Sequence, residues 1–230
     1  MKTIIAKSIF KFISLGAIII IFIACSKNEE NSNDIVTDQD GNKYNTIKIG
    51  NQIWMSENLK TTTYRNGDAI PNITDPTAWY NLSTAAYCDY DNNPANSATY
   101  GKLYNWHAVH SGQLCPTGWH IPSEAEWNIL EAFLGEESLA GGKLKEKNFT
   151  HWQSPNTAAT NETGFTGLPG GFRSSTGAFF NLSYNGYWWG PETGSDISYA
   201  RYHYLDFNIG FLLENEDYKV DGLSVRCIKD

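Results

Sequence analysis

The chain has 230 residues, with 17 basic side chains (Lys and Arg) against 25 acidic ones (Asp and Glu), so its formal net charge at pH 7 is -8. A surface with this excess of acid repels nucleic acid and anionic lipid, which excludes functions that depend on binding either one. The length suits one domain with a sizeable core, and no internal repeat divides it.

The N-terminus has the pattern of an export signal. Lys2, Lys7 and Lys11 precede a mostly apolar run, Phe12 to Ala24. This run is too short for a membrane-spanning helix, which needs about 20 residues, and it suits the apolar part of a secretory signal. The sequence therefore predicts a lipoprotein signal peptide over residues 1–24. An anchor that is never cleaved is the alternative.

Cys25 directly follows the apolar run. Phe22–Ala24 and Cys25 resemble a bacterial lipobox, with phenylalanine in place of the usual leucine, so we expect Cys25 to be lipidated. Residues 25–35 then form a polar tether. Its acidic stretch, Ser26–Glu30, resembles the signal that sends some lipoproteins to the outer face of the outer membrane. This predicts an outer-membrane lipoprotein, displayed on the cell surface unless the acidic stretch is only a solvated linker.

The first predicted elements of the folded domain are a hairpin and a helix. Tyr44–Ile49 and Gln52–Ser56 have strand patterns, and Gly50-Asn51 between them is typical of a hairpin turn. Farther along the chain, apolar residues at helical spacing predict a helix over Gly101–His110.

The clearest helix signal begins at Ser123. Ser123 and Glu126 form a capping-box pattern, apolar residues then recur every three to four positions, and Gly135 is the residue that most easily ends a helix. A short amphipathic helix is predicted over Ser123–Leu134.

The rest of the chain has weaker signals. Ala140–Lys147 is a second helix candidate, although Gly141 and Gly142 disfavour it. From Phe165 onward helix signals are few, and Leu223–Ile228 alternates apolar and polar residues like a half-buried strand. The predicted fold class is α+β, with short strands, two or three helices and much irregular loop.

Three cysteines remain after Cys25. Export past the cytoplasm permits disulfides, so Cys88, Cys115 and Cys227 are all candidates for a bridge. The sequence neighbours of Cys88 are tyrosine and aspartate, with no basic group, so we expect Cys88 to be a buried thiol and not a nucleophile.

Patterns for catalysis and for cofactors are absent from the sequence. The chain lacks the serine-nucleophile elbow, the phosphate-binding glycine loop and the zinc-protease helix motif. Asp89–Asn93 begins a calcium-loop spacing, but Pro94 stands where glycine is needed and Tyr100 where glutamate is needed. His107 and His110 share a predicted helix face without a further ligand. We therefore predict no catalytic residue, no metal and no cofactor.

Aromatic and arginine side chains supply the candidates for ligand binding, since such residues dominate binding surfaces. The candidates are Trp188, Trp189, Tyr199, Tyr202, Tyr204, Arg173 and Arg201. Trp188 and Trp189 are preferred, because the glycines and the proline around them predict a loop. The competing interpretation places half or more of these residues in the core. On that view Tyr202 and Tyr204 share one strand face, Arg201 lies on the other, and one of the two faces is buried.

Several motifs, in order, resemble the Fibrobacter succinogenes major paralogous domain. They are YGKLYNW (Tyr100–Trp106), CPTGWHIPSEAEW (Cys115–Trp127), the segment His151–Arg173, GYWW (Gly186–Trp189) and GLSVRCIKD (Gly222–Asp230). The similarity covers residues 36–230. That family is in turn similar to the formylglycine-generating enzymes, so the resemblance implies their C-type-lectin-like fold.

The resemblance also bears on the cysteines. In those relatives a cysteine before the first helix segment pairs with one in the last strand, which implies a disulfide between Cys115 and Cys227. Formylglycine-generating enzymes use a close cysteine pair upstream of that strand, and this chain has none there, which implies that it is not an enzyme. Gly190–Glu192 and Tyr104–Trp106 do not match the calcium- and sugar-binding motifs of C-type lectins.

We therefore expect a lipid-anchored, non-catalytic module of the cell envelope that acts in recognition or adhesion. Its partners would be the membrane, through the lipid, and a glycan or an envelope protein as ligand. One alternative is a divergent enzyme of the formylglycine-generating type, which would need polar groups converging in a pocket. Another is a structural accessory of an outer-membrane complex, which would need a large exposed apolar patch.

Overall fold

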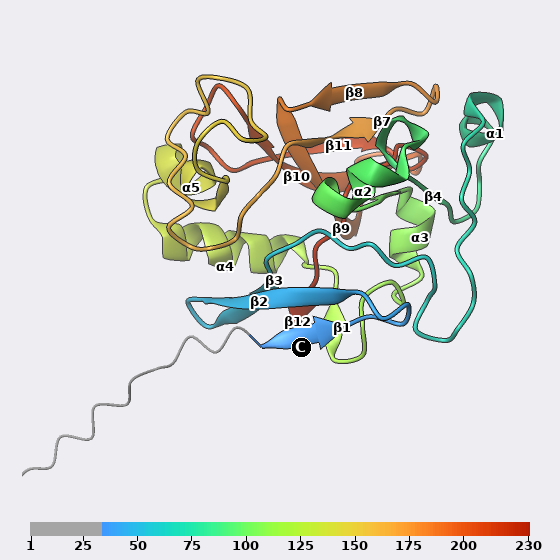
Figure 1. The fold of residues 1–230 in the computed structure, drawn as a ribbon, viewed down its shortest axis with the longest axis horizontal. Coiled ribbons are helices and arrows are strands. Elements are labelled where there is room, and N and C mark those ends of the chain that lie inside the picture. The colour runs from blue at the N-terminus through green and yellow to red at the C-terminus, as the bar shows by residue number, and fades with distance from the viewer. Residues whose placement is uncertain (1–33) are drawn as a thin grey trace, which may run out of the picture. The chain divides into compact units, whose positions relative to one another are not determined.

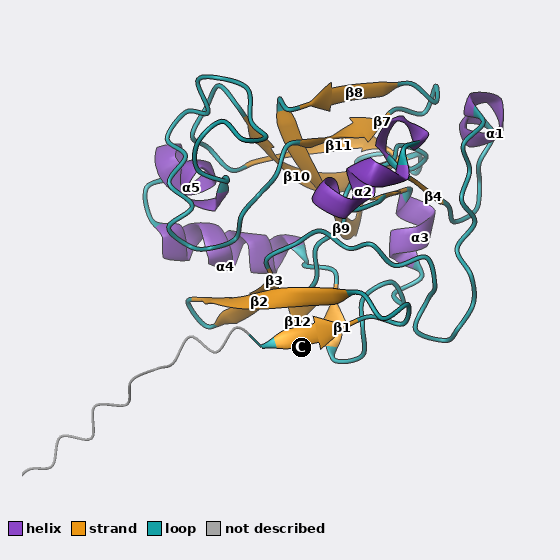
Figure 2. Cartoon of the chain, in the orientation of Figure 1, coloured by secondary structure: helices purple, strands orange, loops and turns teal. Residues whose placement is uncertain are grey.

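Short helices and strands alternate with long loops in this α+β protein (Figures 1 and 2). The computed structural model describes residues 34–230. The predicted signal peptide and Cys25 lie outside the described residues. The elements are β1 (Ile35–Thr37), β2 (Lys43–Ile49), β3 (Gln52–Met55), α1 (Pro76–Tyr80), β4 (Tyr87–Cys88), a 3-10 turn (Tyr90–Asn92), α2 (Pro94–Tyr100), β5 (Leu103–Tyr104), α3 (Trp106–His110), β6 (Trp119–His120), α4 (Glu124–Leu134), α5 (Glu137–Leu144), β7 (Gly170–Arg173), β8 (Phe179–Leu182), β9 (Asn185–Thr193), β10 (Tyr199–Asp206), β11 (Leu213–Tyr218) and β12 (Ile228–Lys229).

The strands form small antiparallel sheets. The largest has the order β1-β2-β3-β12-β6, so the last strand of the chain lies between two early ones. A second sheet has the order β11-β10-β9, and β4-β5 and β7-β8 form two separate pairs. The predicted hairpin is confirmed, since β2 and β3 pair directly on either side of the Gly50-Asn51 turn. Among the helices of residues 34–230, none combines the length and the apolar character needed to cross a bilayer.

Helix α4 confirms the strongest helix prediction and lies between the two larger sheets (Figure 1). Its capping box is formed: the Glu126 carboxylate accepts hydrogen bonds from the backbone N–H and the hydroxyl of Ser123, each 2.8 Å long. On its buried face, the ring of Trp127 lies 4.8 Å from that of Trp54 in β3 and 4.7 Å from that of His203 in β10. Through Trp127, therefore, one helix joins both sheets in a shared core.

The helix predicted over Gly101–His110 is shorter in the structure. The side chain of Asn105 accepts a hydrogen bond from the backbone N–H of Ala108 (3.2 Å), which caps α3 and sets its start at Trp106. The preceding residues, Leu103–Tyr104, pair as strand β5 with β4. A polar cap in the middle of the periodic segment thus divides it into a strand and a helix.

The weaker helix candidate is real but begins earlier, as α5. Its two glycines are required by close backbone contacts. A Cβ atom on Gly141 would lie 2.0 Å from the carbonyl oxygen of Phe211, and one on Gly142 would lie 2.3 Å from that of Ala158. Tertiary packing therefore outweighs the low helix propensity of glycine at these positions.

The C-terminal segment differs most from its prediction. The expectation of a half-buried strand is wrong, because every residue from Asp221 to Ile228 is buried. Only Ile228–Lys229 forms a strand, and the residues before it make single bridges to β5, β7 and β9. The segment runs between separate sheets and meets protein on all sides.

Arg226, in the middle of this segment, is fully buried. Its Nε and Nη2 atoms donate hydrogen bonds to Oδ1 of Asn58 (3.1 and 2.7 Å), and Nη1 donates to the carbonyl oxygen of Phe165. The guanidinium carbon also lies 4.0 Å from the centre of the Phe165 ring. Neutral oxygens and a ring face therefore hold this cation inside the core.

The disulfide between Cys115 and Cys227 is confirmed, with 6.0 Å between the Cα atoms. It ties the loop before β6 to the C-terminal segment across 112 residues of chain. Cys88 is a free, buried thiol, as predicted. Residues 34–230 lie within one compact unit, and this part of the chain contains three hydrophobic clusters and the disulfide.

Removing the disulfide should lower the stability of the protein strongly. We expect Cys115→Ala/Cys227→Ala to lose about 4 to 5 kcal/mol of unfolding free energy, because a loop of 112 residues regains its freedom in the unfolded chain. Urea unfolding followed by tryptophan fluorescence measures this, and the reduced wild type should match the double variant. Cys88→Ala is the control and should cost about 1 to 2 kcal/mol. Equal losses in the two variants would contradict the assigned role.

Replacing Arg226 with lysine tests whether the shape of the guanidinium matters. Arg226→Lys keeps the charge, but one ammonium group cannot span Asn58 and Phe165, so we expect a loss of about 3 kcal/mol or more. Arg65→Lys is the matched control. Arg65 is half-buried and also donates to carbonyl oxygens, and its replacement should cost about 1 kcal/mol or less. Similar urea midpoints for the two variants would show that Arg226 contributes only its charge.

Candidate functional site

Trp188 and Trp189, the preferred ligand candidates, do not lie in a loop. Both belong to strand β9, with exposed fractions of 1% and 0%. Successive side chains of a strand point to opposite faces, and both faces of this sheet are covered. Trp188 therefore enters one hydrophobic cluster and Trp189 another, and their indole N–H groups donate to Asn58 and Tyr104 (2.8 Å each). In this structure neither ring has a face free for a ligand.

The two candidate arginines also have partners within the protein. Arg173 is fully buried and donates hydrogen bonds to the carbonyl oxygens of Ile73, Thr74 and Gly177. Arg201 is partly exposed, and its Nη1 lies 3.1 Å from the Glu124 carboxylate at the start of α4. Arg173 therefore connects the loop at Ile73 and Thr74 to the loop at Gly177, and Arg201 connects β10 to α4.

The tyrosine candidates are the ones that the structure brings together. Tyr202 and Tyr204 share a face of β10, and the ring of Tyr187 on β9 lies 5.7 Å and 5.8 Å from theirs. Tyr202 is buried and Tyr204 half-buried. Tyr199 points to the opposite face, where it packs on Tyr218 of β11. The interpretation that one face of β10 is buried is confirmed by Tyr202, and the structure also covers the other face, where His203 lies beneath α4.

A pocket beside the disulfide is the better candidate site. We call it the disulfide pocket. It has a volume of about 580 Å³, within the size range of ligand sites. Its lining residues are Val109, Gly112, Leu114, Cys115, His120, Ile121, Ser123, Glu126 and Pro191. The apolar members Val109, Leu114 and Ile121 belong to the hydrophobic core, so the pocket opens directly onto a firmly packed floor.

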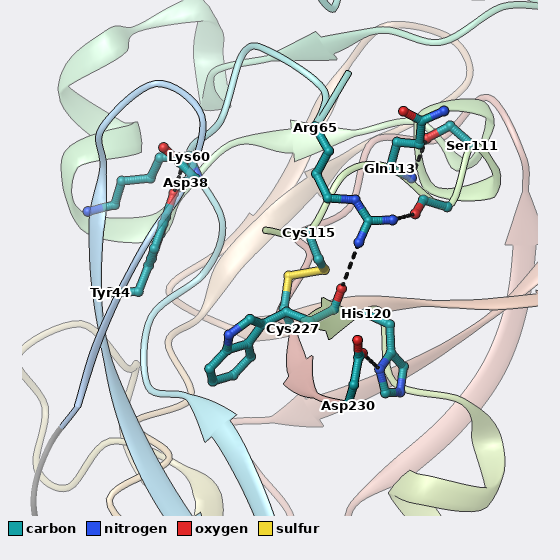
Figure 3. The surroundings of a disulfide bond; sticks show 12 residues. Asp38, Tyr44, Lys60, Arg65, Ser111, Gln113, Cys115, His120, Cys227 and Asp230 are labelled. Atoms are coloured by element: carbon teal, nitrogen blue, oxygen red, sulfur yellow. Dashed lines mark hydrogen bonds and ion pairs between the residues drawn. A yellow bond between two sulfur atoms is a disulfide. The ribbon is translucent and has the colours of Figure 1, made fainter. Parts of the chain in front are cut away.

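The wall of the pocket is held by Arg65. This side chain donates hydrogen bonds to the carbonyl oxygens of Gly112 (2.5 Å) and Trp119 (3.4 Å). Figure 3 shows Arg65 beside the disulfide, near the pair formed by His120 and Asp230. A cation and a covalent bond thus fix the loop that forms one side of the pocket.

His120 lies at the rim between two carboxylates. Its Nε2 is 2.8 Å from Oε1 of Glu126, and its Nδ1 is 2.7 Å from Oδ1 of Asp230. Burial opposes protonation, but the hydrogen bonds and charges of the two carboxylates outweigh it and raise the pKa of His120. Burial likewise opposes ionisation of Glu126, and hydrogen bonds from Ser123 and His120 lower its pKa. The rim therefore favours a protonated His120 between two ionised carboxylates.

These groups do not form a nucleophilic centre. The Ser123 hydroxyl donates to Glu126 and not to His120, whereas an activated serine needs a hydrogen bond to its base. Cys88 is separated from the pocket in another hydrophobic cluster, and burial raises its pKa to about 12. Within residues 34–230 no three His, Cys, Asp or Glu side chains are grouped to hold a metal ion. The arrangement suits binding, with an apolar floor and a charged rim.

The sequence interpretation missed this pocket. His120, Ser123 and Glu126 all belong to the motif that predicted α4, but their roles there were read as local. Asp230 joins them from the far end of the chain, 110 residues from His120. A histidine followed by a capping box was the available signal. It did not indicate which partner would face the histidine.

Replacing His120 should change how stability depends on pH. The folded-state pKa of His120 is raised above its usual 6.5, so its stabilising effect is complete below that value and is lost as the pH rises through the folded-state pKa. We expect His120→Gln to lower the urea midpoint at about pH 5.5 and to change it little at about pH 8.5.

His107→Gln is the control for this experiment. Burial and the charge of Lys219 lower the pKa of His107. Protonation of His107 therefore lowers the unfolding free energy of the wild type as the pH falls. The two variants should therefore differ from the wild type with opposite dependence on pH. A His120→Gln effect that is the same at both pH values would contradict the charged rim.

Comparison with known proteins places the chain in a family. No curated protein and no solved structure matches it at a significant level. A family model described as the Fibrobacter succinogenes major domain matches residues 47–229, which include α4, the disulfide and almost all of the pocket's surroundings. This match covers most of the chain and agrees with the motifs seen in the sequence. The chain belongs to the Fibrobacter succinogenes major domain family.

Proposed function

We propose that this protein is a lipid-anchored, non-catalytic recognition module of the cell envelope, and that its ligand is a protein that inserts an apolar side chain into the disulfide pocket. The observation that carries the proposal is the pocket itself. Its floor is made of core residues, and its polar rim is already hydrogen-bonded internally. Such a site gains free energy by covering apolar surface and has no reactive group to offer.

A protein ligand is favoured over a glycan by the burial of the tryptophans. All eight tryptophans of the chain are buried, including the two that were candidates for stacking on sugar rings. A sugar that stacks on tryptophan would need exposed indole faces, and none of the eight tryptophans offers one. The disulfide pocket instead offers aliphatic side chains, which suit a leucine-like or proline-like group.

The alternatives are less well supported. A divergent enzyme of the formylglycine-generating type would need free polar groups in its pocket, but Ser123, Glu126 and His120 are bonded to one another. A structural accessory of an outer-membrane complex would need exposed apolar surface. Helix α4 does expose Ile129 and Phe133, which also suits a protein partner of a recognition module.

The sequence supports the remaining parts of the proposal. Cys25, in its lipobox-like setting, would carry the lipid, and the acidic residues after it are consistent with the outer membrane and with display at the cell surface. We also propose that the fold is of the C-type-lectin-like kind found in formylglycine-generating enzymes. A disulfide between the segment before α4 and the last strand supports this assignment.

Small fragments can test the pocket directly. We would titrate isotope-labelled residues 34–230 with N-acetyl-leucinamide and N-acetyl-phenylalaninamide, and separately with simple sugars, and follow backbone and methyl shifts by NMR. We expect shifts at Val109, Leu114 and Ile121 with the amides, with dissociation constants of about 1 mM or weaker for such small ligands. Sugars should leave these signals unchanged.

Two tryptophan substitutions on β9 provide the controls. Pro191→Trp places a large ring at the mouth of the pocket and should abolish the shifts. Thr193→Trp adds the same ring to an exposed position on the same strand and should preserve them. Shifts caused by sugars at Tyr202 and Tyr204, with none in the pocket, would refute the proposed protein ligand and restore a glycan.

A further inference from the structure

The outer face of α4 continues from the disulfide pocket. Glu126 lines the pocket, and Ile129 and Phe133 follow it at spacings of three and seven residues, so the three side chains lie along one stripe of the helix. Ile129 and Phe133 are 55% and 60% exposed. The side chains that α4 buries, Trp127, Leu130 and Leu134, lie on the adjacent face of the helix. Large apolar side chains exposed next to a pocket extend the apolar surface that a partner can cover.

The stripe ends at a second pocket. We call this the Phe133 pocket. It has a volume of about 480 Å³ and lies between α4, the turn of the β2–β3 hairpin and the loop at Asn161–Gly164. The Phe133 ring packs on this turn, since a Cβ atom on Gly50 would lie 2.9 Å from the ring. One side of the Phe133 ring is thus exposed, and its other side is held in place by the hairpin turn.

The two pockets differ in charge. The Phe133 pocket contains Lys48 and Lys143. Lys143 lies 3.2 Å from the Glu162 carboxylate, whereas the exposed Lys48 takes part in none of the ion pairs found within residues 34–230. One end of the stripe therefore accepts an apolar group, and the other end has a cation without a counter-ion.

The distance between the ends suits an extended chain. The seven residues from Glu126 to Phe133 span about 10 Å at 1.5 Å per helical residue. An extended polypeptide advances about 3.3 Å per residue and covers this distance in three residues or slightly more. A ligand of this kind can place one side chain in each pocket and lie across Ile129 between them.

We infer that the disulfide pocket, the α4 stripe and the Phe133 pocket form one site for an extended peptide segment of a partner protein. The segment places an apolar side chain in the disulfide pocket and an acidic side chain, three to five positions away, beside Lys48. This inference rests on the function proposed above and adds the length and the charge pattern of the ligand.

The sheet edge at β11 is a poorer place for such a segment. Strand addition needs free backbone N–H groups along the edge. On β11 the N–H groups of Glu216 and Tyr218 donate to the side chains of Asn215 and Asp217 (2.9 Å each). The edge strand thus partly satisfies its own donors, and the side-chain pockets along α4 remain the more suitable surface.

A peptide library can test the inference. We would select phage-displayed random twelve-residue peptides on oxidised residues 34–230 and measure the binding of synthetic copies by fluorescence polarisation. We expect enrichment of an apolar residue with Asp or Glu three to five positions away. Phe133→Ser should weaken binding, and Lys48→Glu should weaken it about fivefold to tenfold by removing one favourable charge and adding an unfavourable one.

The matched control for charge is Lys43→Glu, on the same strand β2 and also exposed, which should leave binding unchanged. When the peptide selection is repeated on the Lys48→Glu variant, we expect Lys or Arg to replace Asp or Glu at the acidic position of the enriched peptides. The extended site would be overturned if Pro191→Trp abolished peptide binding while Lys48→Glu and Phe133→Ser left it unchanged. The proposed function of the disulfide pocket would then stand. If the enriched peptides bound the Pro191→Trp variant as tightly as the wild type, that result would count against the proposed function itself.

Discussion

Arg226 sits in the core where three parts of the chain that are far apart in sequence meet. Its guanidinium binds the side-chain oxygen of Asn58, which also accepts a hydrogen bond from Trp188, and the carbonyl oxygen of Phe165. A cation removed from water is costly unless its donors find acceptors. The fold therefore depends on these oxygens being held in place, and the neighbouring Cys227 anchors the same segment through the disulfide.

Two other buried cations act in the same way. Arg173 donates to carbonyl oxygens of two loops, and Lys145 donates to those of Asp206 and Ile209, each at 2.8 Å. Burial lowers the pKa of Lys145 to about 8. A protein with long irregular loops brings many backbone carbonyls inside that no helix or sheet can satisfy. Buried cations with several donors supply the missing hydrogen bonds and fix the loops to one another.

This arrangement explains how the proposed binding site arises beside α4. Trp127 packs the helix against both larger sheets, which fixes the position of its first turn. Ser123 and Glu126 form the capping box at the N-terminus of the helix, and the same two residues contribute to the rim of the disulfide pocket. The outer stripe of the same helix remains exposed. The start of one helix thus provides the polar rim of the pocket, and its exposed stripe continues the apolar surface that Val109, Leu114 and Ile121 form at the pocket floor.

The sequence by itself determined the elements with strong local signals, and it determined the family. The hairpin at Gly50-Asn51 and the start of α4 at Ser123 depend on residues within a few positions of one another, so their patterns could be read directly. The disulfide could be assigned by resemblance. Tertiary structure alone decided which faces are covered: it buried Trp188 and Trp189 on opposite sides of one sheet, and it brought Asp230 to His120. These outcomes depend on contacts between distant parts of the chain, and no local pattern specifies those contacts.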